Sequence, residues 1–383
     1  MLAVATVGFL LCFWAWALLA PLGPTLREDL RLTSVQQSLV VAVPVIVGSL
    51  GRIPVGALTD RVGARRMFPL VAGLTILPVL YLGHLAASLA EVIVGGLFLG
   101  LGGTAFAVGV PFVNAWYPPG RRGLALGVFG IGTGGTALSS FTTVQLAEAV
   151  APSFPFDLVA GLLAVYAVAA CLLLRDRPGR AVPAGSLLAR TTATLRMPAT
   201  VQLAFLYAVA FGGFVAFSVY LPTYLTNAYD LGRSDAALRT AGFVVLAVAM
   251  RPVGGWLCDR LNPVPVLIAS YSAVAALAFL ASFELALVPF ATIAFLGMAA
   301  ALGAGSGAVF AQVAHVVPAE QVGSVTGVVG AAGGLGGFFP PLVMGTIYGA
   351  AHDYSRGFIL LAATAALAAT AVRRRTKPPR SST

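Results

Sequence analysis

The chain has 383 residues, of which 59% are hydrophobic and only 9% are charged. Soluble domains usually carry about 25% charged residues, so this composition excludes a soluble globular protein and indicates side chains that face lipid or other helices. The net charge of +10 does not indicate nucleic-acid binding, because the basic residues lie between apolar runs rather than on one solvated patch.

Twelve apolar runs, each long enough to cross a membrane as a helix, follow one another along the chain. A transmembrane helix needs about 20 apolar residues, and these runs are too long for the strands of a membrane barrel. Residues 1–26 carry no charge, so we interpret the first run as a transmembrane helix rather than as a signal peptide, which would begin with a positive segment. The predicted spans are residues 2–24, 36–58, 67–88, 91–115, 122–146, 154–174, 200–226, 237–258, 264–283, 286–314, 321–349 and 355–372.

The longest polar stretch between spans is residues 175–198. It predicts an N-terminal six-helix half (1–174), a cytoplasmic linker (175–198) and a C-terminal six-helix half with a short basic tail (199–383). Sixteen of the 23 basic residues fall in the loops and tail on the linker's side of the membrane, and five fall on the opposite side. Because cytoplasmic loops carry the excess of arginine and lysine, we expect a multi-pass protein of the inner (cytoplasmic) membrane with both termini in the cytoplasm.

The two halves repeat each other in sequence. In spans 2 and 8 the segment Arg52–Arg61 matches Arg251–Arg260 at an offset of 199, and in spans 5 and 11 Pro118–Gly130 matches Pro318–Gly330 at an offset of 200. Parallel six-helix repeats related by an axis along the membrane normal resemble the major facilitator superfamily. The resemblance implies an all-α fold of twelve transmembrane helices in two six-helix pseudo-repeats, with a transport site between the halves.

The loop after span 2 resembles the signature loop of that superfamily, which gates the cytoplasmic side in its members. We expect Asp60 either to lie near a helix N-terminus or to pair with arginines across the interface between the halves. The gating-loop residues implied by the resemblance are Gly56, Asp60, Arg61, Arg65 and Arg66 and, in the second copy, Asp259 and Arg260.

Arg52 and Arg251 are the strongest functional signal in the chain. Each lies eight residues before the aspartate of its loop, which places it about 12 Å along the helix and near the middle of the bilayer. Charged residues at that depth usually face a cavity or pair with an acid, and the 13 acidic residues all fall in loops or near span ends. Backbone carbonyls could still satisfy one of the two arginines. Two guanidinium groups facing one cavity from opposite halves predict a small anion as the cargo, since their forked donors suit oxyanions and carboxylates.

Spans 5 and 11 are unusually rich in glycine. Glycine at this density allows close helix packing and also lets the backbone approach a small ligand. These runs, together with Gly303–Phe310, resemble the signatures of the nitrate/nitrite porter family of the major facilitator superfamily. The signature glycines are Gly130, Gly132, Gly134, Gly135, Gly330, Gly333, Gly334, Gly336 and Gly337.

The resemblance implies a set of substrate-binding residues. The contexts of Arg52 and Arg251 match the substrate-binding arginines of the family, and its substrate-wall aromatics resemble Tyr207, Phe211 and Phe106. At two further positions the family usually or often has asparagine, whereas this chain has hydroxyl side chains that can still donate to an oxyanion. These two residues are Thr133 and Ser306.

Exchange of nitrate for nitrite by a monomeric carrier surrounded by membrane lipid is the predicted mechanism. Proton coupling normally needs an intramembrane acid or histidine, and His84, His315 and His352 lie near span ends. Nitrate/proton symport stays open because the span 11 signature also resembles symport-type members. The sequence also leaves open an antiporter of small carboxylates such as formate or oxalate, an anion channel and a membrane sensor. We expect no enzyme activity, cofactor, metal site or nucleic-acid partner.

Overall fold

The computed structural model describes residues 1–178, 187–318, 321–351 and 353–374. Within these residues the chain is helical and contains no strand, which confirms the predicted all-α class. The middle of the predicted linker (179–186), His352 and most of the basic tail (375–383) lie outside the described residues. The helices are α1 (Leu2–Trp16), α2 (Leu19–Asp29), α3 (Ser34–Leu50), α4 (Arg52–Val62), α5 (Ala64–His84), α6 (Leu89–Leu99), α7 (Ala105–Trp116), α8 (Arg122–Gly130), α9 (Gly135–Ala149), α10 (Phe154–Leu173), α11 (Leu187–Arg196), α12 (Pro198–Tyr229), α13 (Arg233–Leu261), α14 (Pro263–Ala281), α15 (Thr292–Val316), α16 (Val322–Ala351) and α17 (Ser355–Arg374).

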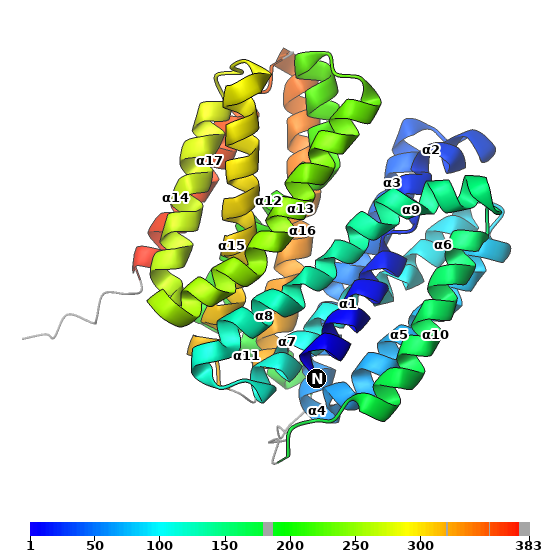
Figure 1. The fold of residues 1–383 in the computed structure, drawn as a ribbon, viewed down its shortest axis with the longest axis vertical. Coiled ribbons are helices and arrows are strands. Elements are labelled where there is room, and N and C mark those ends of the chain that lie inside the picture. Colours follow the sequence, from blue (N-terminus) through cyan, green and yellow to red (C-terminus); the bar gives the residue numbers. More distant parts are fainter. Residues whose placement is uncertain (179–186, 319–320, 352, 375–383) are drawn as a thin grey trace, which may run out of the picture.

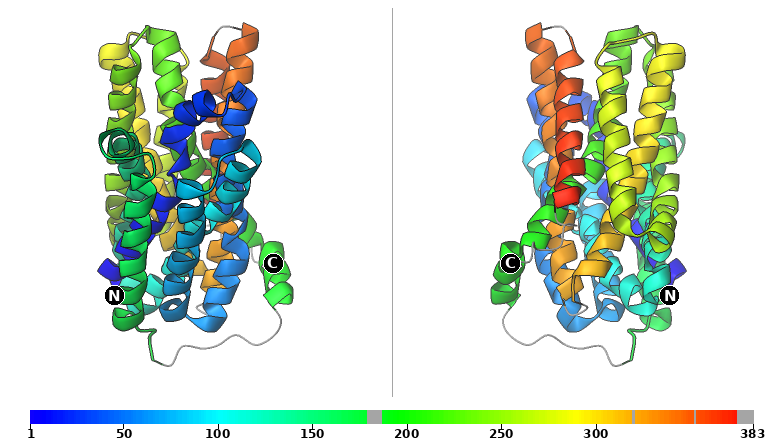
Figure 2. Two further views of the ribbon diagram at one scale, coloured as in Figure 1. Left: turned by 90° about the vertical axis from the view of Figure 1, so that its right-hand side faces the viewer. Right: turned by 90° about the vertical axis from the view of Figure 1, so that its left-hand side faces the viewer.

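The helices gather into two bundles that approach each other at one end and diverge toward the other (Figure 1). One bundle holds α1–α10 and the other holds α12–α17, while α11 packs against α4 and α16 between them. We call the end at which α11 lies the linker end and the opposite end the far end. The start of α1 also lies toward the linker end (Figure 2).

Eleven stretches among the described residues are long and apolar enough to cross a membrane. The remaining predicted span, 36–58, is formed by α3 and α4, which follow each other at Gly51 with helical backbone angles. Helix α4 carries Arg52, which lies inside the predicted span, and Asp60 and Arg61, which lie just beyond its end. The twelve predicted spans and the two-repeat fold class are therefore confirmed.

Three spans that the sequence predicts as single runs are broken in the structure. Span 1 turns at residues 17–18 between α1 and α2, span 4 contains a 3-10 turn at Gly100–Thr104, and span 5 contains one at Ile131–Gly134. Both 3-10 turns are rich in glycine, which has a weak preference for the α-helix. Span 11 runs as the continuous helix α16, and span 10 is α15 preceded by a π-helical turn at Leu287–Ala291, so the repeats differ in backbone although they match in sequence.

Candidate functional site

Arg52 and Arg251 are both buried at the contact between the two bundles, with exposed fractions of 1% and 3%. Arg52 begins α4, and its Nε and Nη1 donate to the carbonyl oxygens of Gly103 and Gly330 at 3.0 and 2.7 Å. Arg251 lies in α13, and its Nη1 donates to the carbonyl of Gly130 at 3.3 Å. Each arginine therefore reaches across to the other bundle and bonds a glycine at the matching place in the repeat.

The glycines beside the arginines leave room for this crossing. A Cβ atom added at Gly130 would lie 3.2 Å from the Cδ of Arg251, and one added at Gly330 would lie 3.1 Å from the Cδ of Arg52. One turn nearer the linker end, a Cβ at Gly127 would lie 2.5 Å from the Arg251 carbonyl oxygen. The sequence repeat thus encodes two equivalent close contacts between a glycine helix and an arginine helix.

The other signature glycines fall into three groups. Gly333 packs directly on the ring of Tyr207, where an added Cβ would approach the ring to 2.3 Å, so it helps to shape the site. Gly132 and Gly135 pack against α1, while Gly336 and Gly337 pack against α12. Gly334 meets the Ser49 hydroxyl, whereas the atom nearest to a Cβ at Gly134 lies 3.9 Å away.

Aromatic rings surround the two guanidinium groups. The Cζ atoms of Arg52 and Arg251 lie 5.9 and 5.1 Å from the ring centroid of Phe211, which the two arginines share. Phe106, Tyr207 and Phe211 are stacked in a row, with centroids 6.1 and 5.1 Å apart and interplanar angles of 5° and 1°. The three predicted aromatic residues therefore come together with both arginines, although their role in binding stays a prediction.

Three further rings belong to this cluster and were not predicted as site residues. Phe13 lies 5.7 Å from the Cζ of Arg52, and Phe214 lies 5.7 Å from that of Arg251. Phe310 meets Phe106 and Tyr207 edge-on at 4.8 and 4.7 Å. Only the helical spacing of Phe214 from Phe211 could have indicated one of them, because phenylalanine in an apolar helix is otherwise indistinguishable from packing.

The charge of the site is not balanced by an acid in the part of the chain that the structure describes. Both arginines donate to backbone carbonyls, Arg251 also interacts with the Tyr207 side chain, and no ion pair joins either arginine to an acid in this part of the chain. Nη2 of Arg251 is buried and has no hydrogen-bond partner. A buried charged donor without a partner costs about 1–3 kcal/mol or more, so an oxyanion beside Arg251 would relieve that cost.

The two predicted hydroxyl ligands point to their own helices in this structure. The Thr133 hydroxyl donates to the Gly130 carbonyl at 2.8 Å, and the Ser306 hydroxyl donates to Leu302 at 2.8 Å. Ser306 nevertheless lines a cavity of about 10 Å³ together with Arg251, Phe106 and Phe310, which is close to the space of one water molecule. Binding of an anion by these hydroxyls would need each to rotate away from its backbone partner, and this role stays a prediction.

The predicted gating-loop aspartates join the two bundles at the linker end. Asp60 accepts hydrogen bonds from the backbone N–H groups of Gly323 and Ser324 at 2.9 and 2.8 Å, in the first turn of α16. Asp259 accepts from Gly123 and Leu124, both at 2.8 Å, in the first turn of α8. The expected contact of Asp60 with a helix N-terminus is therefore present, and the helix dipole favours a negative charge there.

The basic residues of the gating loops lie on the surface of the linker end. Arg61, Arg65 and Arg66 are exposed, and Arg260 lies 5.4 Å from the ring of Trp256. The backbone N–H groups of Ala64 and Arg65 donate to the carboxylate of Asp176, which follows α10. A third aspartate thus binds a helix N-terminus at this end, although this contact lies within the N-terminal bundle.

Replacing Asp60 or Asp259 by asparagine is expected to weaken closure of the linker end. Each change removes a negative charge from a helix N-terminus, an interaction of about 1–2 kcal/mol in buried geometry. We expect faster hydrogen exchange at the first-turn amides of α16 in Asp60→Asn and of α8 in Asp259→Asn, measured by mass spectrometry. Asp235→Asn, which alters an exposed aspartate of the far end, is the control and should leave both turns unchanged. Equal exchange in all three variants would contradict the prediction.

Comparison with known proteins places the chain in a family. A family model described as Major Facilitator Superfamily matches residues 5–341 and 203–383. The probable nitrate/nitrite transporter NarK2 of Mycobacterium tuberculosis (strain ATCC 25618 / H37Rv) is 49% identical over 372 residues, covering 96% of this chain and 94% of the relative. The nitrite extrusion protein of Bacillus subtilis (strain 168) is 36% identical over 364 residues, covering 95% of this chain and 91% of the relative.

Solved structures share the fold at low sequence identity. The transporter FucP in the outward conformation matches with a TM-score of 0.78 and 19% identity, covering 98% of this chain and 99% of that one. The human organic anion transporter MFSD10 matches with a TM-score of 0.79 and 16% identity, covering 97% and 98%. The fold and the sequence relatives agree with the resemblance seen in the glycine signatures, and the chain belongs to the nitrate/nitrite porter family of the major facilitator superfamily.

Proposed function

We propose that this protein carries nitrate and nitrite across the inner membrane by alternating access and exchanges one anion for the other. The observation that carries the proposal is the pair of buried arginines, one from each bundle, around the ring of Phe211. The names of the relatives, which refer to nitrate and nitrite, support these anions as the cargo.

The arginine pair suggests how binding and movement are linked. Two positive charges in a medium of low dielectric repel each other, and an anion between them replaces that repulsion with attraction. An anion that bridges Arg52 and Arg251 would draw the two bundles together, so it favours the transition between conformations. Return of the unloaded protein would be disfavoured by the same charges, and the return step therefore needs a second anion. This logic favours exchange over one-way transport.

The walls of the site favour a small flat anion. Phe106, Tyr207 and Phe211 present parallel rings, and the guanidinium groups of both arginines lie close to that row. Nitrate and nitrite are planar, and guanidinium donates to planar oxyanions through two parallel N–H groups.

The predicted orientation determines which side of the membrane is closed in this conformation. If the linker end faces the cytoplasm, the contacts of Asp60 and Asp259 close the cytoplasmic side while the bundles diverge toward the outside (Figure 1). The site would then receive its anion from the outside. Among the described histidines, His84 pairs with Asp157 at 2.7 Å and His315 bonds a carbonyl of its own helix, both away from the arginines. This placement favours exchange over proton symport.

Transport by purified protein in liposomes tests the proposal. We expect nitrate uptake to require nitrite or nitrate inside the liposomes and to be unchanged by an imposed pH gradient. Uptake driven by the pH gradient without internal anion would establish symport instead. Formate and oxalate should neither compete nor exchange; if they replace nitrate as substrates, the protein is a carboxylate antiporter. Flux that does not saturate and needs no internal anion would indicate a channel.

A further inference from the structure

A second hollow lies away from the arginines, on the outer side of the C-terminal bundle. It has a volume of about 300 Å³ and lies between α12, α16 and α17. Its walls are almost entirely apolar and include Phe217, Phe339, Met344, Phe358 and Leu361. We call this hollow the α17 slot. Its lining excludes an inorganic anion as the occupant.

The mouth of the α17 slot faces the surroundings of the bundle. Phe339 and Leu360 line the slot and are 61% and 52% exposed. They belong to helices that are long and apolar enough to cross a membrane. In a membrane protein, such exposed apolar side chains meet lipid tails rather than water. The slot is therefore open to the hydrocarbon region of the bilayer.

Charged residues lie directly above the α17 slot at the far end. Helix α17 begins at Ser355, and Gly357, in its first turn, lines the slot. Arg356 is exposed beside this glycine, and Asp353 precedes the helix. Hydrogen bonds from the Ser355 hydroxyl and backbone N–H lower the pKa of Asp353 below its usual value, so its carboxylate stays charged. One cation, Arg356, thus lies beside the carboxylate of Asp353 and near that of Glu284, which accepts from the Tyr354 N–H at 2.9 Å, where the helix leaves the membrane.

The dimensions of the slot match one lipid tail below one headgroup. The slot follows α17 from Gly357 to Thr364, seven residues or about 10 Å of helix rise. It therefore descends from the polar boundary into the outer part of the hydrocarbon layer. A tail gains nothing from transfer between two apolar environments, so retention must come from filling a space that would otherwise lack contacts and from the headgroup.

We propose that the α17 slot binds one acyl chain of a phospholipid with an ammonium-bearing headgroup, such as phosphatidylethanolamine. The phosphate of this lipid contacts Arg356, and its ammonium group faces Asp353. A purely anionic headgroup could pair with Arg356 but would bring no positive group to face the Asp353 carboxylate. A headgroup that carries both charges fits the pair, and this selects the lipid class.

The α17 slot lies behind one wall of the transport site. Ala208, Gly213 and Gly336 line the slot, and a Cβ added at Gly336 would lie 2.8 Å from the Ala208 carbonyl, at the crossing of α12 and α16. Tyr207 and Gly333 form the other side of this crossing and belong to the arginine site. A lipid tail in the slot therefore supports the helix wall against which the anion would bind.

Photo-crosslinking in liposomes tests this proposal. The full-length protein is reconstituted in equal parts of phosphatidylethanolamine and phosphatidylglycerol, with a trace of either lipid carrying a diazirine on one acyl chain. After illumination, the labelled peptides are mapped by mass spectrometry. We expect phosphatidylethanolamine to label peptides of α12, α16 and α17 that line the slot about tenfold more strongly than other lipid-facing peptides.

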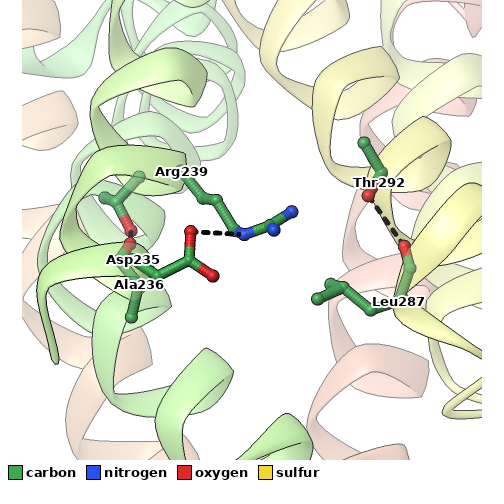
Figure 3. Close-up of polar contacts among 6 residues, drawn as sticks. Asp235, Ala236, Arg239, Leu287 and Thr292 are labelled. Atoms are coloured by element: carbon green, nitrogen blue, oxygen red, sulfur yellow. Dashed lines mark hydrogen bonds and ion pairs between the residues drawn. The ribbon is translucent and has the colours of Figure 1, made fainter. Parts of the chain in front are cut away.

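Two variants with matched controls separate the tail from the headgroup. Thr364→Phe fills the slot and should remove this labelling, whereas Thr370→Phe, six residues along the same helix and outside the slot, should leave it unchanged. Arg356→Gln should lower the labelling severalfold. Its control is Arg239→Gln, because Arg239 is another exposed arginine of the far end and pairs with Asp235 at 3.0 Å (Figure 3).

Three results would overturn the proposal. Labelling spread evenly over all lipid-facing helices and insensitive to Thr364→Phe would mean that the slot holds no particular lipid. Equal labelling by both lipids, unaffected by Arg356→Gln, would reject the headgroup assignment. Crosslinks between two copies of the protein at these peptides would assign the slot to a dimer contact. All three outcomes are independent of whether nitrate is the cargo.

Discussion

Arg251→Lys is expected to weaken nitrate binding about 10- to 100-fold while the protein stays folded. Nη2 of Arg251 is the buried donor without a partner, and Nη1 makes a long bond of 3.3 Å to Gly130. Lysine keeps the positive charge but loses the planar pair of donors. A hydrogen bond to a charged group contributes about 1.5–3 kcal/mol, which corresponds to the stated range. Exchange kinetics in liposomes over a range of nitrate concentrations measure the change as a higher KM.

Arg52→Lys tests whether the second arginine contributes to stability as well as to transport. Arg52 donates hydrogen bonds to the carbonyls of Gly103 and Gly330, at 3.0 and 2.7 Å, and the second of these bonds joins the two bundles. We therefore expect Arg52→Lys to lower the thermal stability as well as the transport rate, whereas Arg251→Lys should leave the melting temperature nearly unchanged. If the two variants lose affinity and stability to the same extent, the arginines do not divide these roles, and the division drawn from their hydrogen bonds is wrong.

The arginine pair was predictable from sequence because a charge inside an apolar run is a strong signal. The repeat offset between Arg52 and Arg251 then placed the two residues at one depth in opposite halves. Glycine-rich runs were equally visible, and their matching positions at Gly130 and Gly330 are the ones that accept the arginine bonds. A charge or a dense run of glycine is unusual in an apolar helix, so both features can be recognised in the sequence.

The partners of these residues were not predictable in the same way. Gly103 accepts from Arg52 inside a 3-10 turn, and the sequence pattern predicts only an uninterrupted span there. Phe13 and Phe310 join the site from helices whose other aromatic residues serve packing, so their residue type carries no distinguishing signal. The α17 slot depends on how loosely one helix packs against two others, which no local pattern encodes.

The two repeats also differ in what packs against one pair of equivalent glycines, Gly134 and Gly334. Gly334 of α16 lies against the hydroxyl of Ser49, which is buried and has no hydrogen-bond partner. The equivalent position, Gly134, has Val248 as its neighbour at ordinary contact distance. Contact between the bundles therefore extends closer to the far end on the α3–α16 side than on the α8–α13 side. Sequence symmetry predicts two equal interfaces, and the side chains of Ser49 and Val248 make them unequal.

Gly255→Ala is expected to hold the linker end open and to lower the transport rate at least about tenfold. A Cβ at Gly255 would lie 1.9 Å from the carbonyl oxygen of Gly123, so the new methyl group meets backbone that cannot rotate away. Overpacking of this kind costs about 1–3 kcal/mol, which shifts the population of the closed linker end by about 10- to 100-fold. The backbone amide of Gly123 bonds Asp259 across this contact, so we expect its hydrogen exchange to report the shift.

Gly161→Ala is the matched control for this variant, because Gly161 lies in the peripheral helix α10 and an added Cβ there would meet nothing within 4 Å. We expect the control to transport and exchange amide hydrogens like the parent protein. A transporter that works by alternating access must close each of its two ends in turn. Gly255→Ala should therefore still bind nitrate but lose turnover. Retention of full transport in Gly255→Ala, with normal protection of Gly123, would mean that the contact between Gly123 and Gly255 is not part of the transport cycle. Loss of binding together with transport would instead indicate that the substitution disturbs Arg251, one turn away on the same helix.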